Sequence, residues 1–570
     1  MSRDGSHLLL PWIAAIVAAM MKRTVLPSLA IPLVISLAAA CWAAGAKGPG
    51  SSASTRPRKT ATGADYMVGP GQDYPRLGDV PWEALDPGAT IRIFWREAPY
   101  NEKFLINRSG TEQKPIRIVG MPGPAGQRPI IDGKNATTRA NQKFRSTGQG
   151  PKSDMQNLAL IVLDGTDYNS PPPEHIVIEG LTLRGASSGI GFTGTAGDAR
   201  TYDEGAACVR VQKGAHITFR HNEISDCDNG LFSQSQEDWN VAKNTANKVN
   251  LTADILIDGN YLHDCGAATG RSTDRHHNSY IQSVGVVYQY NHYGRQRPGA
   301  RGSALKDRSI GTVVRFNRFE GCARSLDLVE AENTPLTALR EPAYRETFVY
   351  GNIIQHDSNA GVAIHYGGDH YGGDAPIAGA SPPWTSANAP WPPSAYGESF
   401  FRQGTLYFYS NTVIINAAGE YGSAIFQIST TQEHAQIFNN VLWISGGPRY
   451  IGLLGPTHDL GRLWTDGGTV NLGVNLFNDG WIVNPDRGAN HASHAVVSGK
   501  EKMLTTSADP IDATSFRLVK GSAGVDAAQS AAAFPSVTSH PVDHEYTEDF
   551  RGRPRVLVGK AMDLGALESF

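Results

Sequence analysis

The feature that most constrains this chain is a repeat in which a short alternating apolar segment ends at an asparagine and a second short apolar segment follows. The repeat recurs at uneven intervals of 26 to 59 residues. Self-similarity at such a period is typical of solenoids, whose units bury their apolar faces only against neighbouring units. The asparagines that end the segments are Asn222, Asn260, Asn291, Asn317, Asn352, Asn411 and Asn440.

This strand–asparagine–strand unit predicts an all-β fold, a single-stranded right-handed parallel β-helix with long loop insertions. Each coil of such a solenoid has three short strands, and strands of successive coils pair in parallel about 4.8 Å apart. The shortest interval, 26 residues between Asn291 and Asn317, is about one coil, and the longer ones are a coil plus an inserted loop. Asparagine suits the turn because it tolerates the left-handed conformation and its amide can bond along the stack.

A seven-bladed propeller is the alternative repeat architecture. It needs four antiparallel strands per unit, joined by hairpin turns at even spacing. The asparagine intervals are too uneven for blades, and hairpin signals are few. The 62 glycines suit a fold with many tight turns, and 40% apolar residues argue against disorder. The sequence therefore favours the solenoid.

Residues 1–46 are predicted to be a signal peptide. An apolar run, 25–40, follows Lys22-Arg23 and leads into small residues, which is the anatomy of a secretory signal, and the true start is then Met20 or Met21. A membrane anchor needs about 20 apolar residues in one run, and the two basic residues interrupt it. A lipoprotein site at Cys41 is the alternative. We expect a secreted or periplasmic monomer without a stable membrane anchor.

Two further boundaries follow from composition. Residues 47–65 are rich in Gly, Ser, Thr, Pro and Lys and are predicted to be a linker, so that the β-helix domain spans 66–570.

The net charge of −3 provides no global field that would attract nucleic acid, which is not expected as a partner.

Four cysteines remain after the leader, too few and too scattered for a disulfide framework. Cys227, Cys265 and Cys322 each stand five residues after a repeat asparagine. This shared register predicts a stack of small side chains inside the solenoid. We expect reduced, buried thiols, although a bridge between Cys227 and Cys265 stays open if their coils are neighbours.

The repeat also places candidate catalytic residues. Aligning the coils at Asn291 and Asn317 puts Tyr280 over Lys306 and Gln282 over Arg308, and the next strand puts Asp327 over Lys306. Side chains alternate between the two faces of a strand. Because the intervening leucines point inward, Tyr280, Lys306 and Asp327 are predicted to form an outward column.

Such a column fits a polysaccharide lyase, in which a base removes the proton α to a uronate carboxylate, cations neutralise that carboxylate and an acid protonates the leaving oxygen. Lys306, with its pKa lowered by Arg308, or His277 is the candidate base. Arg308 or Arg324 is the candidate carboxylate ligand. Tyr280 is the candidate acid.

Two alternatives use the same residues. A glycosidase needs two carboxylates about 5–9 Å apart, and Asp307, Asp327 and Glu330 are the available pool. A binding module would only recognise an acidic glycan. The purely structural interpretation of Lys306 and Asp327 is an ion pair between coils, which would contribute under about 1 kcal/mol to stability when exposed.

Two insertions are predicted to flank the column. The segment Tyr293–Arg301 carries Arg295 and Arg297, which favour an acidic polysaccharide as substrate. The segment Gly367–Tyr396 is rich in proline and glycine, and loops of this length are often functional. Its Trp384 and Trp391 either stack on sugar rings or pin the loop to the solenoid, and His365, just before it, is a further substrate-binding candidate.

No metal ligands are predicted, and a calcium cofactor stays open without a clear ligand motif to support it. His276 and His277 are adjacent on a strand and therefore point to opposite faces, so one of them as a site residue is favoured over both as ligands. No Cys-x-x-Cys pair suggests zinc.

The C-terminal segments Phe516–Ala527, Asp549–Arg555 and Met562–Glu568, together with the asparagine turns, resemble the closing segment of bacterial secreted β-helix proteins of the pectin-lyase-like superfamily. The resemblance covers Tyr66 to Glu568. It implies the fold but no particular activity, because the superfamily includes lyases, hydrolases, esterases, epimerases and inert binding proteins.

Lyases of the alginate lyase and chondroitinase B kind look similar, because they place a lysine and an arginine on neighbouring coils beside a calcium site. Lys306 matches that lysine, but Asp327 and not an arginine stands one coil on, and no clear trio of calcium ligands is seen. The sequence thus predicts a secreted carbohydrate-active protein that cleaves an acidic polysaccharide by β-elimination. The alternatives are a non-catalytic glycan-binding or envelope protein and a glycoside hydrolase.

Overall fold

A computed structural model of the chain describes residues 65–147, 153–240, 245–269, 272–357, 361–369, 401–416, 424–429, 433–445, 452–454, 468–483 and 496–569. Within these residues three long sheets, of 13, 13 and 11 strands, surround one apolar interior. We call them sheets 1, 2 and 3. The predicted signal peptide, most of the predicted linker, Trp384 and Trp391 lie outside the described residues.

Sheet 1 consists, in spatial order, of β1 (Asp65–Val68), β2 (Thr90–Phe94), β4 (Ile116–Met121), β8 (Glu174–Glu179), β13 (Ala215–Arg220), β18 (Ala253–Asp258), β21 (Val284–Gln289), β24 (Ile310–Arg315), β27 (Glu346–Tyr350), β30 (Thr405–Tyr409), β33 (His434–Phe438), β36 (Thr469–Leu472) and β38 (Val496–Ser498). Sheet 2 consists of β11 (Ala199–Thr201), β10 (Gly191–Thr193), β6 (Thr137–Thr138), β3 (Glu102–Ile106), β7 (Ala159–Leu163), β12 (Ala207–Val211), β15 (Asn229–Ser233), β20 (Ser279–Ile281), β23 (Ser303–Asp307), β26 (Arg324–Leu328), β29 (Ile364–Tyr366), β32 (Ala424–Ile428) and β35 (Gly452–Leu454). Sheet 3 consists of β39 (Leu504–Thr506), β37 (Leu476–Asn478), β34 (Val441–Ser445), β31 (Thr412–Asn416), β28 (Ile353–Asp357), β25 (Arg318–Glu320), β22 (His292–Tyr293), β19 (Tyr261–Leu262), β14 (Glu223–Ser225), β9 (Thr182–Arg184) and β5 (Ile130–Asp132).

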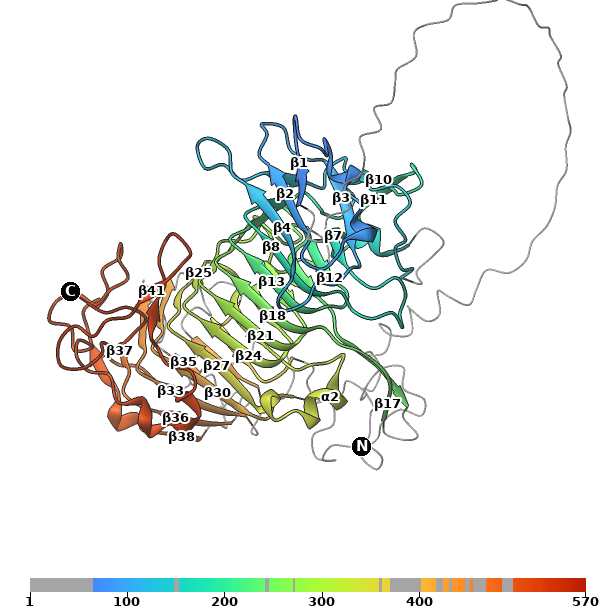
Figure 1. The fold of residues 1–570 in the computed structure, drawn as a ribbon. Coiled ribbons are helices and arrows are strands. Elements are labelled where there is room, and N and C mark those ends of the chain that lie inside the picture. Colours follow the sequence, from blue (N-terminus) through green and yellow to red (C-terminus); the bar gives the residue numbers. More distant parts are fainter. Residues whose placement is uncertain are drawn as a thin grey trace, which may run out of the picture. The chain divides into compact units, whose positions relative to one another are not determined.

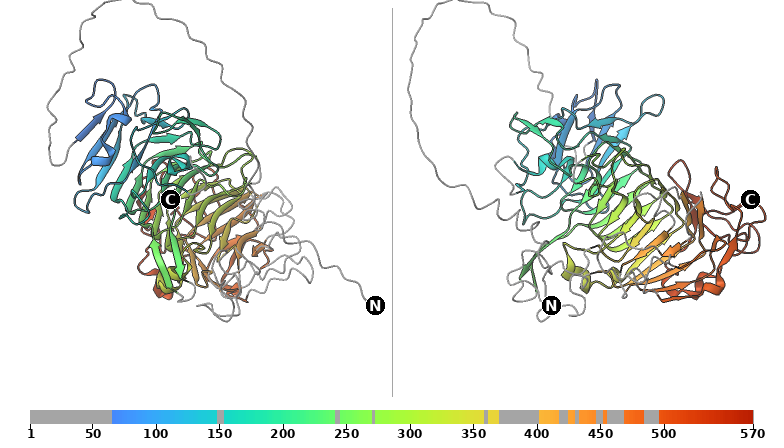
Figure 2. Two further views of the ribbon diagram at one scale, coloured as in Figure 1. Left: turned by 90° about the vertical axis from the view of Figure 1, so that its right-hand side faces the viewer. Right: turned by 180° about the vertical axis from the view of Figure 1, so that it is seen from behind.

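From β12 to β37, apart from the hairpin of β16 and β17, the chain visits the sheets in a fixed order, sheet 2, sheet 1 and sheet 3, and then starts the next coil. The strands β20, β21 and β22 make one such coil, and β23, β24 and β25 make the next. Among the described strands of these sheets only β10 and β11 pair in antiparallel fashion. Strands of successive coils lie side by side in both figures (Figures 1 and 2). The prediction of a right-handed parallel β-helix is confirmed.

Alternation along each strand builds the interior. In β21 and β24 every second residue is buried and its neighbours are partly exposed. The buried residues of adjacent coils stand in register, as Ile255 pairs with Val286 and Ile257 with Tyr288. Fully burying an aliphatic side chain contributes about 1.5–3 kcal/mol, so each coil is stabilised by stacking on the next.

The asparagines form a ladder between sheets 1 and 3. Each side-chain amide donates to the Oδ1 of the asparagine one coil on, over 2.8 to 3.1 Å from Asn222 through to Asn475. The expectation that the asparagine itself takes the left-handed conformation is wrong. The residue before it does, with φ between 51° and 65° at His221, Gly259, Tyr290, Phe316, Gly351, Ser410 and Asn439. The asparagine is thereby free to direct its amide along the stack.

The cysteine prediction is partly wrong. Cys227, Cys265 and Cys322 are buried in the interior as expected, but Cys227 forms a disulfide with Cys208 on β12, 19 residues earlier. Within one coil the turn after β14 brings Cys227 back beneath β12, a proximity that separation along the sequence hides. Cys265 and Cys322 are free thiols.

Other elements project from or cover the coils. The hairpin of β16 (Gln236–Asn240) and β17 (Thr245–Asn250) reaches helix α2 (Pro335–Arg340), where the backbone of Thr337 donates to Glu237 (Figure 1). A second hairpin joins β40 (His544–Glu545) to β41 (Arg553–Pro554). The 3₁₀ helices are η1 (Leu77–Asp79), η2 (Trp82–Ala84), η3 (Met155–Leu158), η5 (Pro342–Arg345), η6 (Lys500–Lys502), η7 (Ala531–Ala533) and η8 (Pro535–Val537).

The C-terminal segment covers an aromatic stack on the outside of sheet 1. Tyr350, Tyr409 and Phe438 lie ring against ring across three coils, and Phe534 adds a fourth ring at 4.0 Å. The segment thus closes over the outer surface of the coils. No helix in the described part of the chain is long and apolar enough to cross a membrane.

Candidate functional site

The register predicted for the outward column is correct. On sheet 2 Tyr280 pairs with Lys306, and Lys306 pairs with Asp327. The row continues in both directions beyond these three residues. We call its part from β12 to β32 the outer row, and it comprises Arg210, Phe232, Tyr280, Lys306, Asp327, His365 and Gln427.

Lys306 lies between two carboxylates. Its Nζ is 2.8 Å from Asp327 Oδ2 and 2.7 Å from Asp369 Oδ2. The Lys306 side chain is 8% exposed and that of Asp327 1% exposed. The pair is therefore buried, and the small value expected for an exposed ion pair does not apply to it.

Arg308 directly follows the last residue of β23 and binds the carboxylate of Asp369, as Lys306 does. Its Nη2 is 2.8 and 2.9 Å from the two oxygens of Asp369, and its Nη1 is 3.1 Å from Glu330 Oε1. Glu332 Oε2 lies 3.6 Å from Nη2. Arg308 and Lys306 thus bind both oxygens of the single carboxylate of Asp369. We call His277, Tyr280, Lys306, Arg308, Asp327, Glu330, His365 and Asp369 the outer cluster.

The expected lowering of the Lys306 pKa is wrong. Burial lowers the pKa of an ammonium group, but Asp327 and Asp369 outweigh burial and the repulsion of Arg308, and they raise the pKa of Lys306 above its ordinary value. Lys306 is therefore a cation in this arrangement. It is suited to binding a carboxylate and not to removing a proton.

His277 is neutral, because burial and the neighbouring charge of Lys306 hold its pKa well below the ordinary value. Its Nδ1 accepts a hydrogen bond from the backbone N–H of Ser303 at 2.8 Å. A neutral imidazole that accepts at Nδ1 carries its proton on Nε2. His277 consequently offers the site an N–H donor, and its basic nitrogen is already engaged.

Tyr280 is half-buried, with its ring edge-on to that of His277 at 5.4 Å. Its Oη accepts a hydrogen bond from Arg308 Nε at 3.1 Å. Burial raises the pKa of Tyr280 above that of a free phenol, although the charge of Arg308 opposes this. The phenol is therefore protonated at neutral pH, and its ionised form would be stabilised by Arg308.

Asp327 and His365 form a buried support beneath the cations. Asp327 Oδ1 is 2.8 Å from His365 Nδ1, and Oδ2 accepts from Ser303 Oγ at 3.2 Å. Despite burial, Lys306 and Arg324 hold the pKa of Asp327 well below its usual value. His365 Nε2 is 3.1 Å from Ser429 Oγ. His365 is 1% exposed and so positions Asp327, whereas it was expected to contact substrate.

Asp307 does not belong to the pool of outward carboxylates. It is fully buried on the inner face of β23, and its Oδ2 is 2.8 Å from Nη2 of Arg402, itself 0% exposed. Tyr288 Oη and Thr312 Oγ1 also donate to its carboxylate. The alternation that points Lys306 outward points Asp307 inward, so the glycosidase pool loses this member.

The other predicted residues divide into two sets. Glu330 is buried against Arg308, and its Oε2 accepts from the backbone N–H of Asp369. Arg324 is more open, and its Nη1 lies 3.9 Å from Asp327. Gln282 is buried and accepts from Asn333. These three lie at or beside the outer cluster.

The arginines of the Tyr293–Arg301 segment have their partners elsewhere. Arg295 pairs with Asp357 at the end of β28 in sheet 3. Arg297 donates to Ser187 and lies 3.9 Å from Asp226. The structure does not bring either residue into the outer cluster, because the segment folds back towards sheet 3.

Sequence reasoning missed Asp369 and Glu332. Asp369 stands at the start of the long insertion Gly367–Tyr396, directly after Gly367-Gly368. Its approach to Arg308 depends on the path of the chain after β29, which no periodic pattern encodes. Within the described residues, no group of three or more His, Cys, Asp or Glu side chains is arranged to hold a metal ion.

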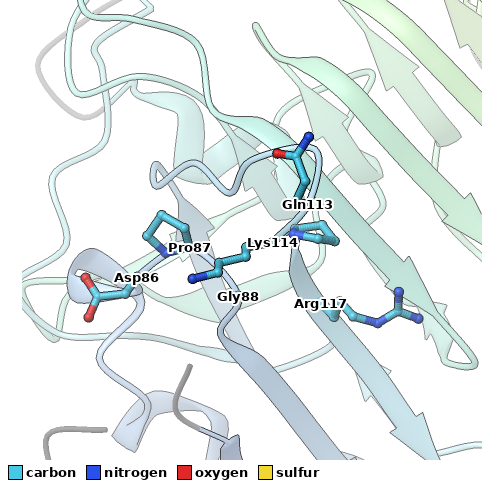
Figure 3. Close-up of a pocket in the computed structure, with 7 residues that line it drawn as sticks. Asp86, Pro87, Gly88, Gln113, Lys114 and Arg117 are labelled. Atoms are coloured by element: carbon cyan, nitrogen blue, oxygen red, sulfur yellow. The ribbon is translucent and has the colours of Figure 1, made fainter. Parts of the chain in front are cut away.

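A surface pocket of about 690 Å³ lies far along the solenoid, on the loops before β2 and β4. It is lined by Asp86, Pro87, Gly88, Gln113, Lys114, Pro115 and Arg117. Figure 3 shows the Asp86 carboxylate and the Arg117 guanidinium pointing away from each other. Side chains that diverge do not form a catalytic constellation, so we place the candidate site at the outer cluster.

Comparisons with known proteins find no matching family model and no matching curated protein. Among solved structures the chain is similar to an alginate lyase from Paenibacillus sp. (13% identity, 74% of this chain and 94% of that chain, TM-score 0.32). It is also similar to a lacto-N-biosidase from Eubacterium ramulus (12%, 77% and 67%, TM-score 0.40) and to a pectate lyase (11%, 88% and 96%, TM-score 0.35).

Similarity at this level says nothing about activity. The fold rests on the parallel registers of the chain's own strands. It is a right-handed parallel β-helix.

Proposed function

We propose that this protein cleaves an acidic, uronate-containing polysaccharide by β-elimination at the outer cluster. One observation carries the proposal: Lys306 and Arg308 together bind both oxygens of one carboxylate, that of Asp369. A uronate carboxylate in the same place would be neutralised by two cations. That neutralisation makes the adjacent carbon acidic enough to lose its proton.

Tyr280 is the proposed proton-transfer group. As a phenolate, stabilised by Arg308 at 3.1 Å, it takes the proton from C5 of the uronate. The electron pair of the C5–H bond forms the C4=C5 double bond, and the C4–O bond breaks with its electrons on the leaving oxygen. That oxygen takes the proton from Tyr280, which returns to the phenolate. His277 supplies an N–H donor beside it.

The remaining residues position these groups. Asp327 holds Lys306 and is itself held by His365 and Ser303. Glu330 holds Arg308 and the backbone of Asp369. Arg324, which is 38% exposed, is proposed to meet the next acidic sugar.

Export from the cytoplasm is part of the proposal. The disulfide between Cys208 and Cys227 is of a kind that persists in oxidising compartments. Residues 1–46 are proposed to be the signal that sends the chain there. A polysaccharide too large to enter a cell would be met outside it.

A glycoside hydrolase is the second candidate, favoured by one observation. Asp327 and Asp369 each have an oxygen within 2.8 Å of the same Lys306 ammonium. Their oxygens are therefore close enough for the carboxyl separation of about 5–5.5 Å found in retaining glycosidases. The burial of Asp327 counts against it as a nucleophile.

The test is incubation of the purified full chain with alginate, pectate and glycosaminoglycans. β-Elimination gives an unsaturated uronate that absorbs in the ultraviolet, whereas hydrolysis gives reducing ends without that absorbance. Absorbance that grows with time and is lost in Tyr280→Phe supports the proposal. Reducing ends alone support the hydrolase, and binding with neither product leaves a glycan-binding protein.

A further inference from the structure

Arg210 lies on β12 in the outer row of sheet 2, three coils before Lys306. The register runs from Arg210 to Phe232, then to Tyr280 and then to Lys306. The Arg210 guanidinium lies 4.2 Å from the centre of the Phe232 ring, and that ring meets the Tyr280 ring edge-on at 5.2 Å. A continuous row of side chains therefore joins Arg210 to the outer cluster.

Arg210 is a buried cation without an anionic partner in the described part of the chain. It is 8% exposed. Its Nε donates to Gln212 Oε1 at 2.7 Å and its Nη2 to Gln234 Oε1 at 3.1 Å, and both partners are neutral amides. Burial lowers the pKa of Arg210 to about 10, although the nearby carboxylate of Asp164 opposes this. A buried charge that makes no direct ion pair is destabilising.

The surroundings add further positive charge. Asp164 is the buried carboxylate nearby, and Arg145 Nε already pairs with it at 3.1 Å. Arg145 Nη2 is itself buried without a hydrogen-bond partner. Lys213 lies close to both, with its Nζ donating to the backbone carbonyls of Asp167 and Tyr168. Around Asp164, three cations thus meet one buried carboxylate.

We propose that Arg210, with Gln212, Gln234 and the face of Phe232, forms a distal subsite for the carboxylate of an acidic sugar. The guanidinium fork matches a carboxylate in bidentate geometry, and the two glutamines fix the orientation of the guanidinium. Three coil steps of about 4.8 Å separate it from Lys306, roughly 14 Å in all. The occupant is therefore an oligosaccharide several residues long, lying along the outer row. The class of ligand rests on the proposed function.

The test measures affinity and not turnover. Both proteins carry Tyr280→Phe, and calorimetry follows the binding of oligouronates of increasing length to chains with Arg210 or with Arg210→Met. We expect Arg210→Met to weaken binding of the long oligomers about tenfold or more and to leave binding of the shortest oligomers unchanged. Arg210→Lys keeps the charge but lacks the guanidinium fork, so its affinity for long oligomers should lie between those of the other two chains.

The matched control is Arg220→Met, which removes an arginine of sheet 1 that is paired with Asp258 at 2.8 Å. Arg220→Met should not change the affinity for oligouronates of any length. Equal affinity of Arg210→Met and the parent for long oligomers would overturn the subsite.

Stability provides the second readout. Because Arg210 has only neutral partners, Arg210→Met is expected to leave the unfolding midpoint unchanged or raise it. A lowered midpoint with unchanged affinity would assign Arg210 a structural role and overturn the proposal. Length-dependent binding by these chains, combined with no ultraviolet-absorbing product from the chain that keeps Tyr280, would refute β-elimination alone and leave the subsite standing.

Discussion

Lys306 and Asp307 are neighbours on β23, yet their ion pairs lie on opposite faces of sheet 2. The inner pair, Asp307 with Arg402, is 0% exposed on both sides. On the outer face the carboxylate that joins Lys306 to Arg308 belongs to Asp369, whose side chain is 27% exposed. One strand thus carries one sealed ion pair and one that borders solvent.

The difference lies in how deeply the partners of each pair are buried. Asp307 accepts hydrogen bonds from Tyr288 and Thr312 as well as from Arg402, whose Nε donates to the backbone of Val329. These hydrogen-bond partners, Tyr288, Thr312 and Val329, are themselves at most 1% exposed. Asp369 and Arg402 flank the same insertion between β29 and β30, but only the Asp369 side chain borders solvent. A ligand can replace such a partner without opening the core, and so we assign stability to the inner pair and chemistry to the outer cluster.

The largest expected effect tests the inner pair. Asp307→Asn leaves the Arg402 charge buried without compensation, and the loss of one partner of a buried ion pair destabilises a protein by about 3–5 kcal/mol. Denaturant unfolding measures this. The double variant Asp307→Asn with Arg402→Met should recover most of the loss, because neither charge remains. A single variant within about 1 kcal/mol of the parent would mean that the inner pair is not a stability element.

The next effect tests the outer cations. Lys306→Ala and Arg308→Ala are each expected to lower kcat by about 10²–10³-fold, the usual effect of removing one group that stabilises developing charge. Arg308→Lys should recover little, because lysine has no fork for two carboxylate oxygens. Arg315→Ala, an arginine of sheet 1 bound to Gln289, is the matched control. Full activity of Lys306→Ala would exclude Lys306 from the reaction.

The same contrast shows how much the sequence could predict. Periodicity fixed the register of Tyr280, Lys306 and Asp327, because every coil must present its apolar side chains to one interior. The same alternation, applied one residue further, would have removed Asp307 from the outward pool. The row thus follows from local pattern alone.

Contacts made by inserted segments did not follow from any pattern. Asp369 and Arg402 flank an insertion, and their partners are 63 and 95 residues away in sequence. The raised pKa of Lys306 depends on Asp327 and also on Asp369, so the pattern could predict only one of the two carboxylates that raise it. The Cys208–Cys227 disulfide was missed for a related reason, since it joins two sides of one coil.

The pH dependence tests whether Tyr280 acts as proposed. Burial raises the pKa of Tyr280, so at neutral pH only a small fraction is phenolate. We expect kcat/KM to rise about tenfold per pH unit through the alkaline range and to keep rising beyond pH 10, the ordinary pKa of tyrosine. Tyr280→Phe should give a low, flat profile. A rate that falls over this range would make Tyr280 an acid only and leave the base elsewhere.

The smallest expected effect concerns Asp369, where the comparison with the inner pair is sharpest. If the Asp369 carboxylate occupies the place of the substrate carboxylate, then Asp369→Asn removes a competitor, and KM should fall about three- to tenfold with kcat little changed, since an ion pair near the surface is worth about 1 kcal/mol. Asp357→Asn, which breaks the pair with Arg295 on sheet 3, is the control and should leave KM unchanged. In a hydrolase the same Asp369→Asn change would instead remove a catalytic carboxyl group and abolish turnover. The direction of this one change therefore separates the two enzyme mechanisms that share the outer cluster.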